Sequence, residues 1–114
     1  METLRIADIQ SKKAISAILM SKDVAYFKIG KTVDDLEDRR NGDEEYMKDY
    51  DEILPVYESE DKALIDELEK VLIRDYRKAY TRRCKNEQEG GGPNCADSDK
   101  PYGRIYVVVK YVTE

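Results

Sequence analysis

A change of hydrophobic period at Gly30 constrains the fold more than any other feature of this chain. Residues 25–29 form a β-prone and largely apolar stretch, whereas apolar side chains recur at helical spacing after the glycine. A strand is therefore predicted to pass the chain to a helix at Gly30. This helix is expected at 33–40, closed by Asn41-Gly42. We expect the functional site at this turn.

The other elements are predicted from the same kinds of pattern. They are a buried strand at 14–20, a strand at 51–57, a helix from about 60 to about 80, a loop at 87–100 and a strand at 102–112. The first strand is expected to form an antiparallel hairpin with 25–29. Pro55 lacks an N–H and places its strand at a sheet edge, and Ser59 is the predicted N-cap of the long helix. The fold class that follows is α+β, a small antiparallel sheet flanked by helices.

Length and composition set limits on what the protein is. The 114 residues fit one domain, 1–114, with a single modest core. Hydrophobic residues make up 40% and charged residues 39%, which is typical of a globular chain with a highly charged surface. No apolar run approaches the roughly 18 residues of a membrane span, and the N-terminus lacks the pattern of a signal peptide. We expect an intracellular protein, cytoplasmic or nuclear, without a membrane partner.

The chain contains no histidine, which excludes Ser-His-Asp and Cys-His nucleophile systems. Its two cysteines, Cys84 and Cys95, flank a glycine-rich loop and are interpreted as ordinary thiols, because a reducing compartment disfavours a disulfide. Any catalysis must therefore use carboxylates, Tyr, Lys, Arg or a metal ion.

Charge is distributed unevenly along the chain. The net charge of −5 argues against a general nucleic-acid binder. From Asp34 to Glu67 there are fifteen Asp or Glu and four Lys or Arg, whereas the segment 74–85 is strongly basic. We expect any nucleic-acid contact to use this basic segment; the alternative is that it only balances the acidic middle of the chain.

The predicted long helix has a broad apolar stripe with one acid inside it. Glu69 lies in the stripe between Ile65 and Ile73. A carboxylate that faces a core is costly unless it is paired or bound to a cation. Two interpretations stay open: Glu69 reaches water or pairs with Arg39 or Arg40, or it is a metal ligand.

Three motifs together resemble the GIY-YIG endonuclease superfamily. The first is a strand that ends in Ile29-Gly30, followed by Lys31-Thr32 and by Leu36 and Arg39 at Leu-x-x-Arg spacing. The second is the helical Leu68-Glu69-Lys70-Val71-Leu72-Ile73, and the third is Asn86 before the glycines at 90–92. In that family the helical Glu binds one divalent metal ion, tyrosines help to activate the nucleophile, and an Arg supports the phosphate.

The resemblance implies roles for individual residues. Glu69 would hold Mg²⁺ or Mn²⁺, Arg39 would contact the phosphate, and Tyr26 would stand for a catalytic tyrosine. The nucleic-acid contacts expected from the motifs and the basic segment are Lys31, Arg40, Arg74, Arg77, Lys78, Arg82, Arg83 and Asn86. Lys28 occupies the Tyr position of the family's Tyr-Ile-Gly motif, which corresponds to Lys28-Ile29-Gly30 here. The Tyr of the family's Gly-Ile-Tyr motif falls at Ile18, so that tyrosine is missing from the expected strand.

The resemblance implies a metal-dependent DNA endonuclease. Two alternatives remain open. One is a degenerate copy that binds nucleic acid without cutting it, and the other is an acidic module that binds a protein partner. Lys31 and Arg39 also fit an ordinary solvated helix face.

Overall fold

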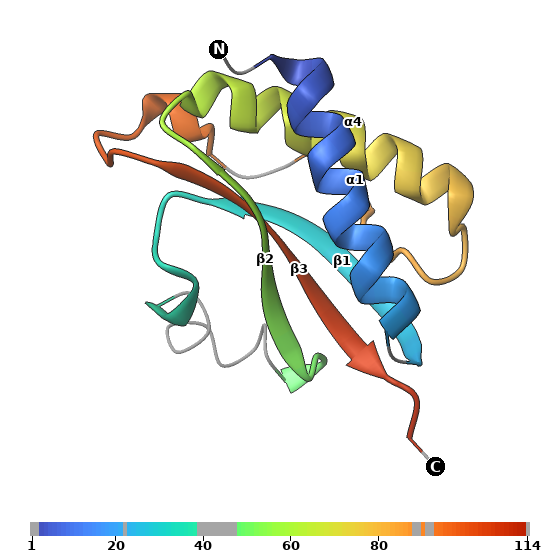
Figure 1. Ribbon diagram of the computed structural model, residues 1–114. Coiled ribbons are helices and arrows are strands. Elements are labelled where there is room, and N and C mark those ends of the chain that lie inside the picture. The colour runs from blue at the N-terminus through green and yellow to red at the C-terminus, as the bar shows by residue number, and fades with distance from the viewer. Residues whose placement is uncertain (1–2, 22, 39–47, 88–89, 91–92, 114) are drawn as a thin grey trace.

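Two long helices pack on a three-stranded antiparallel sheet (Figure 1). The computed structural model describes residues 3–21, 23–38, 48–87, 90 and 93–113. The elements are α1 (Leu4–Ser21), β1 (Val24–Thr32), β2 (Glu52–Ser59), α4 (Lys62–Ala79), the short 3₁₀ helix η1 (Cys95–Asp97) and β3 (Gly103–Tyr111). The strand order is β1-β3-β2, and β3 is antiparallel to both neighbours. The predicted α+β class is confirmed.

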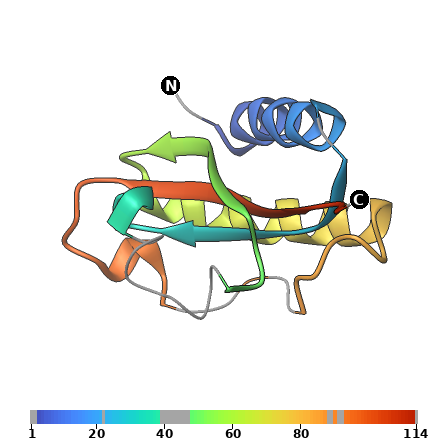
Figure 2. The same cartoon turned by 90° about the horizontal axis from the view of Figure 1, so that it is seen from below.

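One face of the sheet forms the core with both helices. Phe27 and Ile29 of β1 join Ile105, Val107 and Val109 of β3 in one buried cluster with apolar residues of α4 and α1. α4 contacts all three strands, and α1 crosses α4 (Figure 1). α1 lies outside the level of the sheet and α4 (Figure 2). None of the described helices is long and apolar enough to span a membrane.

The predicted strand at 14–20 is wrong, because these residues belong to α1. The buried positions of α1 are Ala7, Ser11, Ile15 and Leu19, a spacing of four that corresponds to about one helical turn and places them on one face of the helix. The apolar run at 14–20 looked like a strand because short apolar runs do not distinguish the two structures. The expected hairpin is therefore wrong as well, and β1 pairs with β3 instead.

Gly30 does not end the strand, contrary to the prediction of a turn there. β1 continues to Thr32, and Gly30 pairs with Tyr106 of β3. Helical structure begins later, at residues 36–38, and the remainder of the predicted helix, with Arg39, Arg40 and Asn41-Gly42, lies outside the described residues. Lys31 consequently lies on a strand and not on a helix face.

The remaining elements follow the predictions closely. β2 is an edge strand, and its pairing with β3 shifts register between Pro55 and Tyr57. α4 starts two residues later than expected: its N-cap is Asp61, whose carboxylate accepts a hydrogen bond from the Leu64 N–H at 3.1 Å, and not Ser59. Ser59 Oγ instead accepts from the Asp61 N–H at 2.9 Å, so it supports the cap from outside the helix.

Truncation of Leu68 tests the packing of α4 on the sheet. Leu68 is fully buried, so Leu68→Ala is expected to lower the free energy of unfolding by about 2–5 kcal/mol. Urea unfolding at equilibrium measures this loss. Met20→Ala is the control, because the Met20 side chain is 85% exposed, and its effect should stay within about 0.5 kcal/mol. A loss below about 0.5 kcal/mol for Leu68→Ala would show that this face is not the core.

Candidate functional site

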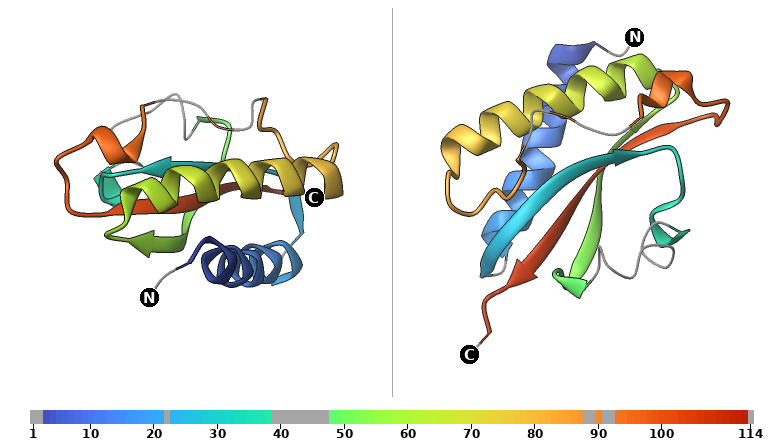
Figure 3. Two further views of the ribbon diagram at one scale, coloured as in Figure 1. Left: turned by 90° about the horizontal axis from the view of Figure 1, so that it is seen from above. Right: turned by 180° about the vertical axis from the view of Figure 1, so that it is seen from behind.

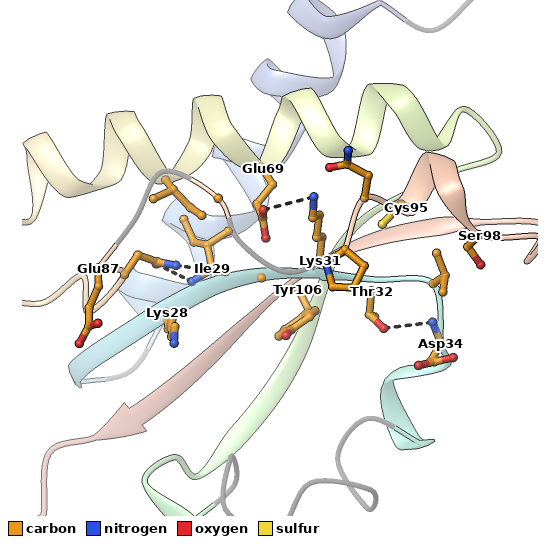
Figure 4. A pocket seen from close by; sticks show the side chains of 17 residues that line it. Lys28, Ile29, Lys31, Thr32, Asp34, Glu69, Glu87, Cys95, Ser98 and Tyr106 are labelled. Atoms are coloured by element: carbon orange, nitrogen blue, oxygen red, sulfur yellow. Dashed lines mark hydrogen bonds and ion pairs between the residues drawn. The ribbon is translucent and has the colours of Figure 1, made fainter.

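A pocket of about 500 Å³ lies along the outer edge of β1, and we call it the β1-edge pocket. β1 contributes residues 28–32 to its lining (Figure 4). Glu69 and Ile73 come from α4, Asn86 from the segment after α4, and Cys95 from η1. α4 runs alongside the strand (Figure 3), and the segment around η1 closes one end of the pocket. Residues far apart in the sequence therefore meet at one strand edge.

Asn86 forms one wall of the pocket and satisfies the main chain of β1. The Ile29 N–H donates to Asn86 Oδ1 at 2.9 Å, and Asn86 Nδ2 donates to the Ile29 carbonyl at 2.8 Å. Just before it, the Phe27 N–H donates to the Arg83 carbonyl at 2.9 Å, and the Lys85 N–H donates to the Phe27 carbonyl at 2.8 Å. The side-chain amide thus continues a strand-like pairing, and the pocket begins where this pairing ends.

Three buried charged side chains meet at the α4 side of the pocket: Lys31, Asp66 and Glu69, called here the Lys31 cluster. Lys31 Nζ lies 2.9 Å from Asp66 Oδ1 and 3.8 Å from Glu69 Oε1. Their side chains are 5%, 9% and 5% exposed, respectively. Figure 4 shows Lys31 directed from β1 toward Glu69, whereas Lys28 and Tyr106 lie on the other side of the strand. Among the described residues, Lys31 is therefore a cation that Glu69 faces, as the position of Glu69 in an apolar stripe led us to expect.

The cluster shifts the proton affinities of its members. Burial by itself would lower the pKa of Lys31, but the hydrogen bond with Asp66 and the charges of Glu69 and Asp66 outweigh it and raise this pKa. Burial also opposes ionisation of Asp66, yet hydrogen bonds from Lys31 and from the Cys95 and Ala96 N–H groups hold its pKa below the usual value. Lys31 and Asp66 are thus both charged at neutral pH.

Burial, with the nearby Asp66 carboxylate, raises the pKa of Cys95 to about 11. Its thiol therefore stays protonated at neutral pH and is a poor nucleophile. Cys84 is also buried, and its Sγ donates to Asn86 Oδ1 at 3.4 Å. Both cysteines are free, as predicted.

A metal ion at Glu69 would find few protein ligands. Among the described residues, no group of three or more His, Cys, Asp or Glu is placed to hold a metal ion. Mg²⁺ usually keeps several waters and takes only one or two carboxylates from the protein. An ion held in that way at Glu69 would take one carboxylate from the pocket wall and would have Lys31 as a neighbouring positive charge.

Tyr106 is a pocket residue that the sequence analysis did not select. It faces Gly30 across the β1–β3 pair, and its ring lies over the glycine: a Cβ on Gly30 would come within 2.5 Å of Tyr106 Cζ and Oη. Gly30 is therefore required by close packing and not by a turn. Asp66 was missed too, although its place three residues before Glu69 on the same helix face was a usable signal.

The other predicted site residues lie elsewhere. Tyr26 is outside the pocket lining; its hydroxyl donates to the Asp49 carbonyl at 2.9 Å, and its ring packs edge-on against Tyr50. Arg83 donates to the Val24 carbonyl at 3.0 Å and stacks on Tyr80.

The four other predicted nucleic-acid contacts of the basic segment are on the outside of the molecule near the end of α4. Arg74 lies beside Asp75, Arg77 is half-buried, and Lys78 and Arg82 are exposed. None of these four, nor Arg83, is part of the described pocket lining.

Comparison with known proteins identifies no relative. No protein-family model matches the chain, and no curated protein or solved structure matches it significantly.

A methyl group at Gly30 tests the contact with Tyr106. Gly30→Ala is expected to lower the free energy of unfolding by about 1–3 kcal/mol, because the buried ring must move. Urea unfolding measures the loss. In a Tyr106→Leu background the same change should cost clearly less, since the smaller side chain leaves room. An equal cost in both backgrounds would show that Tyr106 is not the reason for the glycine.

The acid dependence of stability tests Asp66. The folded protein holds the pKa of Asp66 below its unfolded value, so its stabilising contribution is present at neutral pH and is lost as pH falls through the folded pKa. Between about pH 5 and pH 2, the free energy of unfolding of Asp66→Asn should therefore fall less than that of the wild type. At pH 7 the variant should be less stable by about 1–3 kcal/mol.

Urea unfolding at several pH values measures both effects. Asp97→Asn is the matched control, because Asp97 is an exposed acid of η1, and it should follow the wild type. Parallel pH curves for the wild type and Asp66→Asn would contradict the role of Asp66.

Proposed function

We propose that the β1-edge pocket is the active site of a phosphodiesterase of GIY-YIG type that cleaves DNA with one divalent metal ion. The observation that carries this proposal is the meeting of three motifs in one pocket. The strand motif at residues 28–32, Glu69 of the helix motif and Asn86 after the helix all line it. Because they come from separate segments, an accidental resemblance would not be expected to bring them together.

The position of Tyr106 supports the proposal further. The family's Gly-Ile-Tyr motif is expected on a strand antiparallel to the strand that carries the Tyr-Ile-Gly motif, which is β1 here. β3 is the antiparallel neighbour of β1, and it carries Gly103-Arg104-Ile105-Tyr106, which is the same order with one residue inserted. We infer that Tyr106 takes the place of the missing tyrosine. The Gly-Ile-Tyr motif would then follow the other motifs along the chain instead of preceding them.

The residues of the pocket suit a phosphodiester substrate. Lys28, half-buried at the pocket, supplies a positive charge for a phosphate oxygen. The hydroxyl of Tyr106, which lines the pocket, can donate a hydrogen bond to the phosphate or to an attacking water. A metal ion on Glu69 would supply charge neutralisation for the phosphate. Arg39, the proposed phosphate contact, lies outside the described residues.

One observation favours a second candidate function. Glu69 already faces the Lys31 ammonium, so the Lys31 cluster is also able to serve as a purely structural ion pair. In that case the protein would bind nucleic acid without cleaving it, or it would itself be an acidic module that binds a protein partner. The net charge of −5 favours a protein partner over DNA for such a degenerate site.

A nuclease assay with two helix variants separates these functions. The wild type is incubated with plasmid and single-stranded DNA in millimolar Mg²⁺ or Mn²⁺. Glu69→Gln keeps the shape of the side chain but loses its charge, so cleavage should fall at least about 100-fold. Tyr106→Phe should lose about 10-fold or more if its hydroxyl takes part.

Glu67→Gln is the matched control on the same helix, because the Glu67 side chain is 62% exposed, and it should cleave like the wild type. Wild-type protein that leaves DNA intact with both metals, or Glu69→Gln that cleaves at the wild-type rate, would refute the nuclease function.

A further inference from the structure

The Lys31 ammonium lies unevenly between its two carboxylates. Its distance to Asp66 Oδ1, 2.9 Å, is that of a charge-assisted hydrogen bond. Its distance to Glu69 Oε1, 3.8 Å, is too long for a hydrogen bond and is a charge contact only. Asp66 therefore holds the lysine, and Glu69 is near it without binding it directly.

Asp66 is fixed in this role by the segment before β3. Its Oδ1 accepts a hydrogen bond from the Cys95 N–H at 2.7 Å, and its Oδ2 accepts one from the Ala96 N–H at 3.1 Å. The carboxylate of α4 is thus anchored to η1 through both oxygens. Because all three side chains of the cluster are more than nine-tenths buried, the ammonium has no easy route to bulk water.

A further cation next to Glu69 would be attracted by the carboxylates of Glu69 and Asp66 and repelled by the Lys31 ammonium. A divalent ion bound to a carboxylate oxygen at about 2.0–2.6 Å would lie within a few ångströms of the ammonium. At such separations inside a protein, like charges repel strongly. The affinity of Glu69 for a metal ion must therefore depend on where Lys31 is held.

We propose that Lys31 is an internal competitor of the metal ion at Glu69, and that Asp66 weakens this competition by holding the ammonium to one side. Asp66 is then a positioning residue that acts through Lys31. The inference rests on the proposed function only in taking Glu69 as a cation ligand.

Calorimetric titration of the full chain with Mn²⁺ tests the competition without a cleavage assay. Lys31→Met removes the ammonium and keeps most of the side-chain volume, so it should bind Mn²⁺ at least about tenfold more tightly than the wild type. Lys110→Met is the matched control. Lys110 is a strand lysine paired with Asp51 at 3.2 Å, away from the pocket, and its loss should leave the affinity within about twofold of the wild type. Equal or weaker Mn²⁺ binding by Lys31→Met would overturn the proposal.

A double variant keeps the test decisive if two buried carboxylates prevent Lys31→Met from folding. Lys31→Met with Asp66→Asn removes one positive and one negative charge and leaves Glu69 in place. It should show a cooperative urea transition and bind Mn²⁺ more tightly than the wild type. Glu69→Gln added to this variant should abolish that binding, which would place the ion at Glu69. Unimproved affinity in the folded double variant would overturn the proposal.

The role of Asp66 is tested by Asp66→Asn in both backgrounds. If Asp66 acts through Lys31, its loss should weaken Mn²⁺ binding strongly with Lys31 present and much less in the Lys31→Met background. An equal effect in both backgrounds would show that only the charge of Asp66 matters.

The two proposals fail in different ways. A wild type that binds Mn²⁺ but leaves DNA intact would refute the nuclease and leave the competition standing. A wild type that cuts DNA and binds Mn²⁺ as tightly as Lys31→Met would refute the competition and leave the nuclease function standing.

Discussion

The burial of β3 is the constraint on which the rest of the structure depends. Residues 105–109 of this strand are all buried, so both of its faces are covered and both of its edges are hydrogen-bonded. β1 and β2 do not pair with each other, and they belong to one sheet only because each pairs with β3. The helices then have a single apolar surface to cover, formed by alternate residues of β1 and β3. The β1-edge pocket lies beside this covered surface, at the outer edge of β1.

The Lys31 cluster joins three elements of the fold, β1, α4 and η1, through charged and polar groups in addition to the apolar core. Lys31 comes from the sheet and Asp66 from α4, and the Cys95 N–H group belongs to η1. A buried ion pair adds little net stability, but it is costly to break, so it favours one arrangement of these elements over others. A site built in this way is rigid where its charges are held.

The sequence predicted those elements whose pattern is long and regular. α4, β3 and the edge position of β2 follow from helical spacing, from a β-branched and aromatic run and from Pro55, respectively. α1 could not be separated from a strand within seven residues, because its apolar side chains occupy more than one face; Met20 at its end is largely exposed. The pairing of β1 was therefore predicted with the wrong partner. Its true partner, β3, is distant in sequence, and Tyr106 of β3 lies opposite Gly30.

The site was predicted to a similar extent. The cost of a carboxylate in an apolar stripe predicted a cation near Glu69, and among the described residues Lys31 is such a cation. Arg39 and Arg40, the arginines expected there, lie outside the described residues. Which lysine of β1 faces α4 depends on strand register, and register is set by the partner strand.

Asn86 also affects how readily the protein can aggregate in a crowded solution. By occupying the outer main chain of β1, the segment that ends at Asn86 leaves little of that edge for a foreign strand, and Pro55 interrupts the opposite edge. A sheet of three strands is thereby guarded against edge-to-edge aggregation.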